Sequence, residues 1–350
     1  MKNRRIQGLD LARFFAFAGM VVVNFQVVMR APQSPSISFL ADILAFLEGK
    51  AAATFVVLAG IGVSLAYQQS VSDHFHAIML KRAGFLLGVG LVNMLVFDAD
   101  IIHYYAFYFA IGIWLLPLSR KALLGATSAI ILTSPALMLV FNYDAGWDWN
   151  TLSYSGFWTP MGFISNLFFN GWHPVVPWLA FFSFGIFLAK LDLSTSANAI
   201  RMAIFGTAGL MIVTLLSAVS VNVLTTNIGA DAAAIFSTSP IPPGPLYMLN
   251  GISTAMLVIG FCLMLPKAIY QNTLIKTLCQ TGQQTLTLYI AHIVIGMSML
   301  ETFGLIGTTT APIALWAAIE FVVISAIYVY FWRKRFQRGP LEEIMRRIAS

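Results

Sequence analysis

Residues 9–29 read LDLARFFAFAGMVVVNFQVVM and contain two charged side chains, Asp10 and Arg13, both near the start of the run. A helix needs about 20 mostly apolar residues to cross a bilayer, so this stretch is long enough to span a membrane. Residues 312–332, which read PIALWAAIEFVVISAIYVYFW, form a second such run, with Glu320 as its one charged residue. Membrane-spanning helices are therefore predicted near both ends of the sequence.

The rest of the sequence has the same character. Of its 350 residues, 59% are hydrophobic and 10% are charged, whereas soluble domains carry about 25% charged residues. Continuous apolar runs fit spanning helices, because the strands of a membrane β-barrel alternate apolar and polar residues. We therefore predict an all-α polytopic membrane bundle of about ten transmembrane helices, forming a single integral membrane domain over residues 1–350. The further apolar runs lie at about 51–67, 83–97, 101–118, 122–141, 175–189, 202–224, 246–265 and 285–306.

The basic residues are distributed unevenly between the two sides of the predicted bundle. Successive connections lie on opposite sides of the membrane, and nearly all of the 20 Lys and Arg residues fall on one side, with Arg30 and Lys50 on the other. Lys and Arg are enriched in cytoplasmic connections, so both termini are predicted to be cytoplasmic. The formal charge of +6 is then explained by the Lys and Arg residues of the cytoplasmic connections, and no nucleic acid partner is expected. The basic side carries Lys2, Arg4, Arg5, Lys81, Arg82, Arg120, Lys121, Lys190, Arg201, Lys267, Lys276, Arg333, Lys334, Arg335, Arg338, Arg346 and Arg347.

The connections on the opposite side carry acidic and aromatic side chains. The longest, residues 142–172, is rich in Trp and Tyr, which commonly anchor helix ends at a membrane interface. The alternative is an aromatic surface that stacks on a sugar ring or another flat acceptor outside the membrane. The acidic residues are Asp98, Asp100, Asp144, Asp148 and Asp231, and the aromatic residues are Trp147, Trp149, Tyr154, Trp158 and Trp172.

Polar side chains inside the predicted spans are candidates for function, because a bilayer tolerates them only when they are paired, hydrated or facing a cavity. Asp10 and Arg13 are three residues apart and share a helix face, either as a structural ion pair or as part of a site. Asn24 lies in the outer half of the same helix, where it either joins two helices by a hydrogen bond or acts in chemistry. Glu48 and Lys50 flank a glycine before the next span, and Lys50 either reaches the membrane surface or holds an anionic or carbonyl oxygen.

Histidines supply the candidate general bases. His173 precedes a helix start that contains Pro174, Pro177 and Trp178. Prolines free backbone carbonyls, which a membrane protein tolerates only where protein or a water-filled cavity receives them. His173 is therefore a candidate base at a break in the helix, or else a structural histidine at the interface.

His292 and Glu320 fall near the middle of the last two predicted spans, where ionisable residues are functional candidates by default. If the two helices are neighbours, these side chains could pair, in a catalytic site or in a proton relay. His103 is expected to be an interfacial residue. His74 and His76 are two residues apart and lack further ligands, so no metal site is expected.

Motifs for nucleotide binding and for common hydrolases, such as the Walker A loop and H-E-x-x-H, do not occur in the sequence. The sequence therefore lacks the usual signatures of ATP-driven pumping and of nicotinamide chemistry. Two classes of function remain. One is a membrane-embedded transferase, and the other is a transporter or lipid-handling carrier that uses His292 and Glu320 for proton coupling.

Four motifs, in order, resemble the bacterial YeiB family and the related heparan-alpha-glucosaminide N-acetyltransferases. The first runs from Arg5 to Asn24, the second begins at Glu48 and continues to Gly62, and the others lie at residues 282–289 and 336–346. The resemblance implies a member of the transmembrane acyltransferase superfamily in a bacterial inner (cytoplasmic) membrane. It also implies an acyltransferase-like part over about residues 1–190 and a YeiB-like part over about residues 200–350.

The same resemblance implies transfer of an acyl group, acetyl in the first place, from a cytoplasmic acyl-CoA to an extracytoplasmic glycan or small-molecule acceptor. Asn24 matches an active-site asparagine of the heparan acetyltransferases, but the catalytic histidine that follows it there has no counterpart in residues 25–50. His173 or His292 would then act as base, and Asn24 or Lys50 would stabilise the oxyanion. The sequence is compatible with a homodimer. The cations expected to hold the CoA phosphates are Arg13, Lys81, Arg82 and Arg338, and the other polar site residues are Asp10, Glu48, Glu320 and Trp178.

Overall fold

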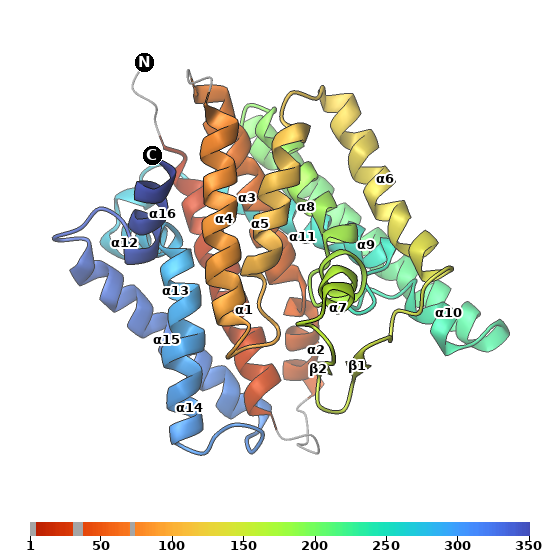
Figure 1. Ribbon diagram of the computed structural model, residues 1–350. Coiled ribbons are helices and arrows are strands. Elements are labelled where there is room, and N and C mark those ends of the chain that lie inside the picture. Colours follow the sequence, from red (N-terminus) through yellow and green to blue (C-terminus); the bar gives the residue numbers. More distant parts are fainter. Residues whose placement is uncertain (1–4, 31–37, 71–73) are drawn as a thin grey trace. The chain divides into compact units, whose positions relative to one another are not determined.

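The computed structural model describes residues 5–30, 38–70 and 74–350, and nearly all of its regular structure is helical (Figure 1). Lys2 and Arg4, two of the basic residues behind the predicted topology, lie outside the described residues. Helices are the expected outcome for apolar runs in lipid, because a helix satisfies every backbone polar group within its own segment. The chain forms two compact units. Unit 1 comprises Met1–Phe55, Ser194–Ala203 and Val258–Arg347, and unit 2 comprises Val56–Leu193, Ile204–Leu257 and Ile348–Ser350.

Each predicted apolar run contains a helix. Within the described residues, 8 helices are long and apolar enough to cross a membrane, and up to 9 spans result if the bent pair Pro160–Asn170 and Val175–Ala189 is one span. This confirms the all-α, multi-pass fold class. The run predicted at residues 101–118 differs, because its apolar helix, Ile102–Leu115, ends before it reaches span length.

Unit 1 is built around α1 (Gln7–Met29), which packs against α12, α13 and α15. The approach of α12 to α1 depends on a glycine, since a Cβ on Gly282 would collide with the backbone carbonyl of Asp10. Helices α13 and α14 continue one another through a π-helical turn, η4 (Figure 1). The elements are α2 (Ser38–Leu47), η3 (Ile269–Gln271), α12 (Thr273–Gly282), α13 (Thr285–Ala291), η4 (His292–Met297), α14 (Ser298–Thr302), α15 (Ala311–Trp332) and α16 (Pro340–Ala349).

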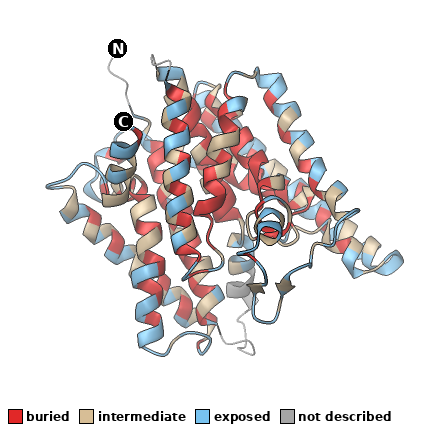
Figure 2. Cartoon of the chain, viewed as in Figure 1, coloured by how far each residue is buried: buried red, intermediate tan, exposed pale blue. Residues whose placement is uncertain are grey.

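Unit 2 contains two well-packed helix pairs, α4 with α5 and α6 with α8. A Cβ on Gly90 of α4 would collide with the backbone of His103 on α5, so glycine permits this close approach. Helix α6 shows mostly half-buried and exposed side chains (Figure 2). The elements are α4 (Phe75–Asn93), α5 (Ile102–Gly112), η1 (Ile113–Leu115), α6 (Arg120–Met138), β1 (Trp147–Asp148), β2 (Ser153–Tyr154), α7 (Pro160–Ser165), η2 (Asn166–Asn170), α8 (Val175–Ala189) and α10 (Ala230–Ala234).

Three further helices contain residues of both units: α3 (Lys50–Gln69), α9 (Ser196–Asn227) and α11 (Pro245–Met264). The apolar run at residues 83–97 lies in a longer helix, because α4 begins at Phe75 and includes Lys81 and Arg82. The prediction of a break near the prolines of α8 is also confirmed. The two helices there are bent by 49°, and Val176 departs from helical torsion angles.

Candidate functional site

The side chains of Asn24 and His292 meet in unit 1. Asn24 lies on α1, and His292 is the first residue of the π-helical turn η4. The distance between Asn24 Nδ2 and His292 Nε2 is 2.9 Å, and the side chain of His292 is fully buried. Two polar residues that the sequence singled out separately are therefore hydrogen-bonded partners.

The hydrogen bonds of His292 assign its tautomer. Its Nδ1 bonds to the backbone carbonyl of Tyr289, and because a carbonyl can only accept, Nδ1 carries the proton. Nε2 is then unprotonated and accepts from the Asn24 amide. An imidazole with a free-base Nε2 is the form a general base requires, and the amide has a second N–H that this bond does not use.

Aromatic rings surround the imidazole. Ring centres lie 4.8 Å from His292 for Tyr289, 6.4 Å for Phe25 and 6.4 Å for Phe321. Phe321 thus occupies the position beside His292 that the sequence assigned to Glu320, whose side chain is exposed. The predicted pairing of His292 with Glu320 is wrong, because one residue along a helix turns the side chain by about 100°.

The C-terminal helix holds the segment that carries His292. Glu342 of α16 accepts hydrogen bonds from the backbone N–H groups of Leu286 (2.8 Å) and Thr287 (3.1 Å) and from the Thr287 hydroxyl (2.5 Å). These donors belong to the first turn of α13, where N–H groups have no partner within the helix. Glu342 therefore caps the helix that leads directly into η4.

A cluster of cations surrounds Asp10 near the start of α1. Its carboxylate accepts from Arg5 Nε (2.6 Å), Arg13 Nη1 (2.7 Å) and Gln283 Nε2 (2.9 Å). The predicted Asp10–Arg13 pair is thus present, with further donors. Burial lowers the pKa of Arg333, and the nearby positive charge of Arg5 lowers this pKa further. Several cations here share one carboxylate.

Comparison with known families bears on the remaining classes of function. Residues 5–225 match the model described as heparan-alpha-glucosaminide N-acetyltransferase, catalytic. The chain belongs to this family. Residues 200–350 match a second model, described as a protein of unknown function (DUF418), and no curated protein matches the chain. At family level the protein is therefore an acetyltransferase-like, multi-pass membrane protein.

Lys50 and Glu48 of this heparan-alpha-glucosaminide N-acetyltransferase family member also lie in unit 1. Lys50 is buried, with its Nζ 3.4 Å from the carbonyl of Ala45 and 5.5 Å from the centre of the Phe46 ring. Glu48 is exposed. The Lys50 ammonium thus contacts the end of α2 and one aromatic ring, and it also interacts with the charge of Glu48.

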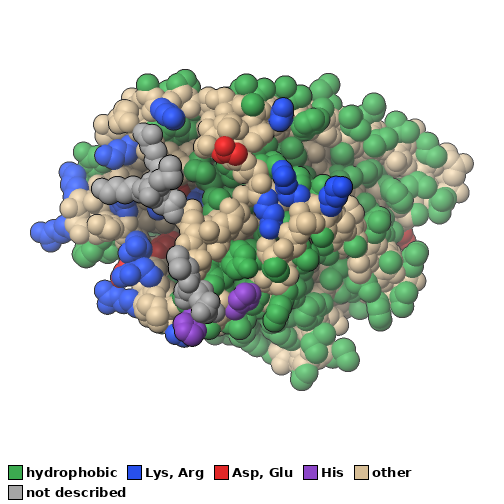
Figure 3. Space-filling model, turned by 90° about the horizontal axis from the view of Figure 1, so that it is seen from above, with side chains coloured by type: hydrophobic (Ala, Val, Ile, Leu, Met, Phe, Trp, Pro, Cys, Tyr) green, Lys and Arg blue, Asp and Glu red, His purple; other side chains and the backbone are tan. Residues whose placement is uncertain are grey.

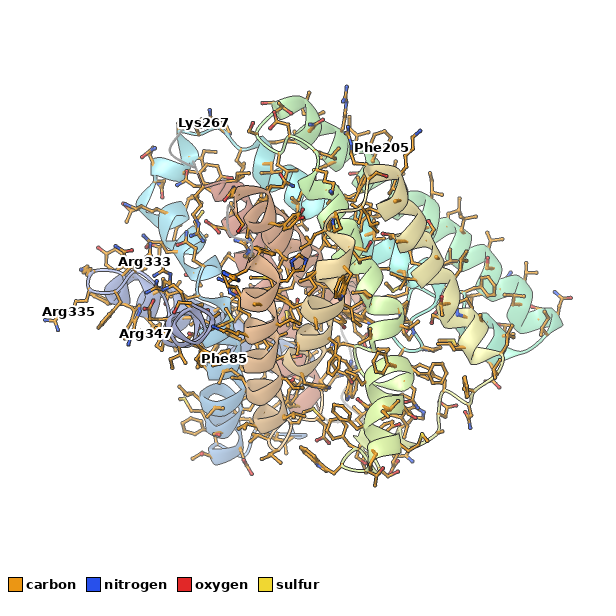
Figure 4. All side chains as sticks on the ribbon, turned by 45° about the horizontal axis from the view of Figure 1, so that its top comes forward. Phe85, Phe205, Lys267, Arg333, Arg335 and Arg347 are labelled. Carbon is orange, nitrogen blue, oxygen red and sulfur yellow. The ribbon has the colours of Figure 1, made fainter. Side chains whose placement is uncertain are left out.

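The residues predicted to hold the CoA phosphates lie in different places. Arg338 lies in the α15–α16 segment, which also carries Arg333, Arg335 and Arg347 (Figure 4), and its Nη1 is 3.2 Å from Glu343 Oε2. Lys81 and Arg82 belong to α4 of unit 2, where Lys81 is exposed and Arg82 half-buried.

His173 and Trp178 of the family member belong to unit 2. Their ring centres are 4.6 Å apart, and the backbone carbonyl of His173 accepts from the Tyr108 hydroxyl (2.5 Å). Trp178 is fully buried. His173 lies in the bend between η2 and α8, as the prolines that follow it predicted. Both π-helical turns are thus close in sequence to a candidate histidine: η2 ends just before His173, and η4 begins at His292.

One buried pair in unit 2 was not predicted from the sequence. His103, expected to be an interfacial residue, is fully buried, and its Nδ1 lies 2.9 Å from Oδ2 of the equally buried Asp100. The Asp100–His103 pair could have been predicted from the sequence, because its residues are three apart, as Asp10 and Arg13 are. Across residues 5–30, 38–70 and 74–350, no group of three or more His, Cys, Asp or Glu side chains is placed to hold a metal.

Proposed function

We propose that this protein is a membrane-embedded acyltransferase that moves an acyl group, acetyl in the first place, from a cytoplasmic acyl-CoA to an acceptor outside a bacterial inner membrane. One observation carries the proposal: the hydrogen bond between half-buried Asn24 and fully buried His292, in a chain of an N-acetyltransferase family. The acceptor class we propose is a glycan or a small molecule with a hydroxyl or amine. A lipid bilayer is the environment of the protein, and neither nucleic acid nor a metal ion takes part.

His292 acts as the general base. An arriving acceptor replaces the Asn24 N–H at Nε2, and this nitrogen takes the acceptor proton as the acceptor oxygen or nitrogen attacks the thioester carbon. The backbone carbonyl of Tyr289 keeps the proton on Nδ1 and orients the ring. A positioned base of this kind typically accelerates a reaction by about 10²- to 10⁴-fold.

Asn24 stabilises the charge that develops during the reaction. Once the acceptor has displaced it from Nε2, the amide N–H donates to the carbonyl oxygen of the thioester as that oxygen becomes negative. Collapse of the tetrahedral intermediate re-forms the carbonyl and breaks the carbon–sulfur bond. The departing CoA thiolate takes the proton from the imidazolium of His292, so protons and electron pairs balance. Lys50 is the second candidate for this stabilisation.

The basic cluster around Asp10 is the proposed place for the CoA phosphates. Arg5, Arg13 and Arg333 outnumber the one carboxylate, and the Arg5 side chain is 60% exposed, which leaves guanidinium N–H groups for a phosphate. Lys and Arg side chains (blue) also clearly outnumber acidic ones (red) on the face shown in Figure 3. Arg338, Lys81 and Arg82 are the other proposed contributors.

A thermal-shift measurement tests the donor. Purified protein in detergent is expected to melt at a higher temperature in acetyl-CoA, because a ligand that binds the folded state stabilises it. His292→Ala should show the same shift, since the base is not needed to hold the donor. No shift with acetyl-CoA or a longer acyl-CoA, together with proton-coupled uptake that Glu320→Gln abolishes, would establish a carrier instead.

A further inference from the structure

Unit 2 contains a buried carboxylate outside the proposed acyl-transfer site. Asp100 has no exposed surface and accepts three hydrogen bonds: from Asn93 Nδ2 (2.8 Å), from the backbone N–H of His103 (3.0 Å) and from His103 Nδ1 (2.9 Å). Burying a charge is costly unless it is hydrogen-bonded and paired. The three residues Asn93, Asp100 and His103 form what we term the Asp100 cluster.

Two acceptors of the Asp100 cluster lack a partner. Asp100 can only accept, so Asn93 Nδ2 and His103 Nδ1 must donate to it, and this fixes the amide orientation and the histidine tautomer. Asn93 Oδ1 and His103 Nε2 are then both acceptors, and both are buried without a hydrogen-bond partner among the described residues. Buried polar atoms are rarely left unpaired. The group that would complete the cluster is therefore a hydrogen-bond donor.

A cavity of about 250 Å³ lies close to the Asp100 cluster, although none of the three cluster residues belongs to its wall. Phe157 belongs to its wall and has its ring centre 5.8 Å from that of His103. The wall also contains Met94, which follows Asn93, and Asn166, which accepts from the hydroxyl of Tyr104. This volume is far larger than one water requires and slightly below the roughly 300 Å³ at which pockets for drug-sized ligands begin.

The walls of this cavity are acidic and aromatic. Its lining includes Asp98, with the rings of Tyr154, Phe157 and Trp158. Among the described residues of the wall, Asp98 is the one charged side chain, and no Lys or Arg faces it there. A negative field with aromatic faces favours a cation.

We propose that unit 2 carries a binding site for a small protonated amine, whose N–H groups donate to His103 Nε2 and Asn93 Oδ1 while its carbon chain lies in the cavity against Phe157. Asp100 and Asp98 supply the negative charge. An ammonium has three N–H donors and no acceptor, which matches a cluster whose unpaired atoms are both acceptors. The site rests on its own contacts and does not require the acyl transfer proposed above.

Ligand-observed NMR titrations of the full-length protein in nanodiscs of phosphatidylcholine and phosphatidylglycerol, without amine-headed lipids, test the site. The probe is n-propylammonium. Two reference compounds separate its properties: 1-propanol has the same chain without the charge, and tetramethylammonium has the charge without N–H donors. We expect saturable binding of n-propylammonium and affinities about ten-fold weaker for both reference compounds.

Variants locate the binding. His103→Phe removes the Nε2 acceptor and should weaken n-propylammonium binding about ten-fold or more. Asp98→Asn, at an exposed position that folding should tolerate, should weaken it about three-fold, and it remains informative if the buried variant fails to fold. Asp148→Asn, at an exposed aspartate outside the cavity lining, is the matched control and should bind like the wild type.

Three results would overturn the proposal. Equal binding of 1-propanol would show that the charge is not recognised, and equal binding of tetramethylammonium would show that the N–H groups are not. Unchanged affinity in Asp98→Asn and in every folded His103 variant would place n-propylammonium elsewhere.

Discussion

The proposed mechanism gives Asn24 two tasks: one N–H holds His292 at rest, and an N–H stabilises the oxyanion during the reaction. Asn24→Asp keeps the size of the side chain and removes both N–H donors at neutral pH. The turnover rate is expected to fall about 10²- to 10³-fold, as when one oxyanion donor is removed from other enzymes, while acetyl-CoA binding stays the same. Steady-state kinetics with separate kcat and KM check this.

Asn227→Asp is the matched control for this substitution. Its side chain is exposed and bonds only to the backbone of its own helix, at Val223. A turnover rate in Asn24→Asp equal to that of the control would remove Asn24 from the chemistry.

At the scale of residues, the sequence identified Asn24 and His292 as candidates, but it did not predict that they are hydrogen-bonded to each other. Asn24 and His292 stand out because polar groups are costly in apolar spans. Their contact joins positions 268 apart, and a single sequence does not say which helices are neighbours. For the same reason the pairing of His292 with Glu320 was wrongly predicted, since the sequence does not say which face of α15 is turned toward His292. In the structure that face carries Phe321.

At the scale of elements, α16 stabilises α13 through one carboxylate. Glu342→Ala leaves three donors of α13 without their acceptor and should lower the free energy of unfolding by about 1–2 kcal/mol. Glu343→Ala is the matched control on the next residue, since Glu343 pairs only with arginines of its own segment and should change stability little. Equal losses in the two variants, measured by reversible unfolding in detergent, would contradict the capping role.

The two glutamates should also respond to pH in opposite directions. Burial raises the pKa of Glu342 above its ordinary 4.5, so the fold is most stable below that value, and the part of its stability that depends on the protonated group is lost as pH rises through the raised pKa. Hydrogen bonds from Arg346 and Arg347 lower the pKa of Glu343 to about 2. Its contribution is present above its ordinary 4.5 and is lost as pH falls towards about 2.

Melting temperatures against pH measure this difference, with Glu342→Gln and Glu343→Gln as references that do not titrate at these positions. Relative to its reference, the wild type should lose stability with rising pH for Glu342 and gain it for Glu343. Slopes of the same sign at both positions would contradict the burial of Glu342 against α13.

The elements themselves were largely predictable, because helices are the only way for long apolar runs to satisfy their backbone in lipid. The ends of the helices and their local irregularities were harder to predict from the sequence. The break before α8 could be predicted from its prolines, which disrupt regular helix. The π-helical turn at His292 has no comparable signal, since η4 contains ordinary apolar residues around the histidine.

At the scale of the whole molecule, the distribution of basic residues predicts the orientation in the membrane. A reporter active only outside the cytoplasm, fused after Gly146, should be active, and the same reporter fused after Lys267 should be silent, because Lys and Arg mark cytoplasmic connections. Fusions in bacterial cells, with a reporter active only in the cytoplasm as the reciprocal control, measure both positions. A cytoplasmic signal at Gly146 would reverse the proposed direction of transfer.

The central claim is that His292 removes the acceptor proton during acyl transfer. Transfer of labelled acetyl from acetyl-CoA to glucosamine by purified protein in proteoliposomes tests it, with His292→Ala beside His76→Ala, a half-exposed histidine in unit 2. The wild type and the control should transfer acetyl, and the rate in His292→Ala should be about 10²- to 10⁴-fold lower at unchanged acetyl-CoA binding. Equal rates in the wild type and His292→Ala would contradict it.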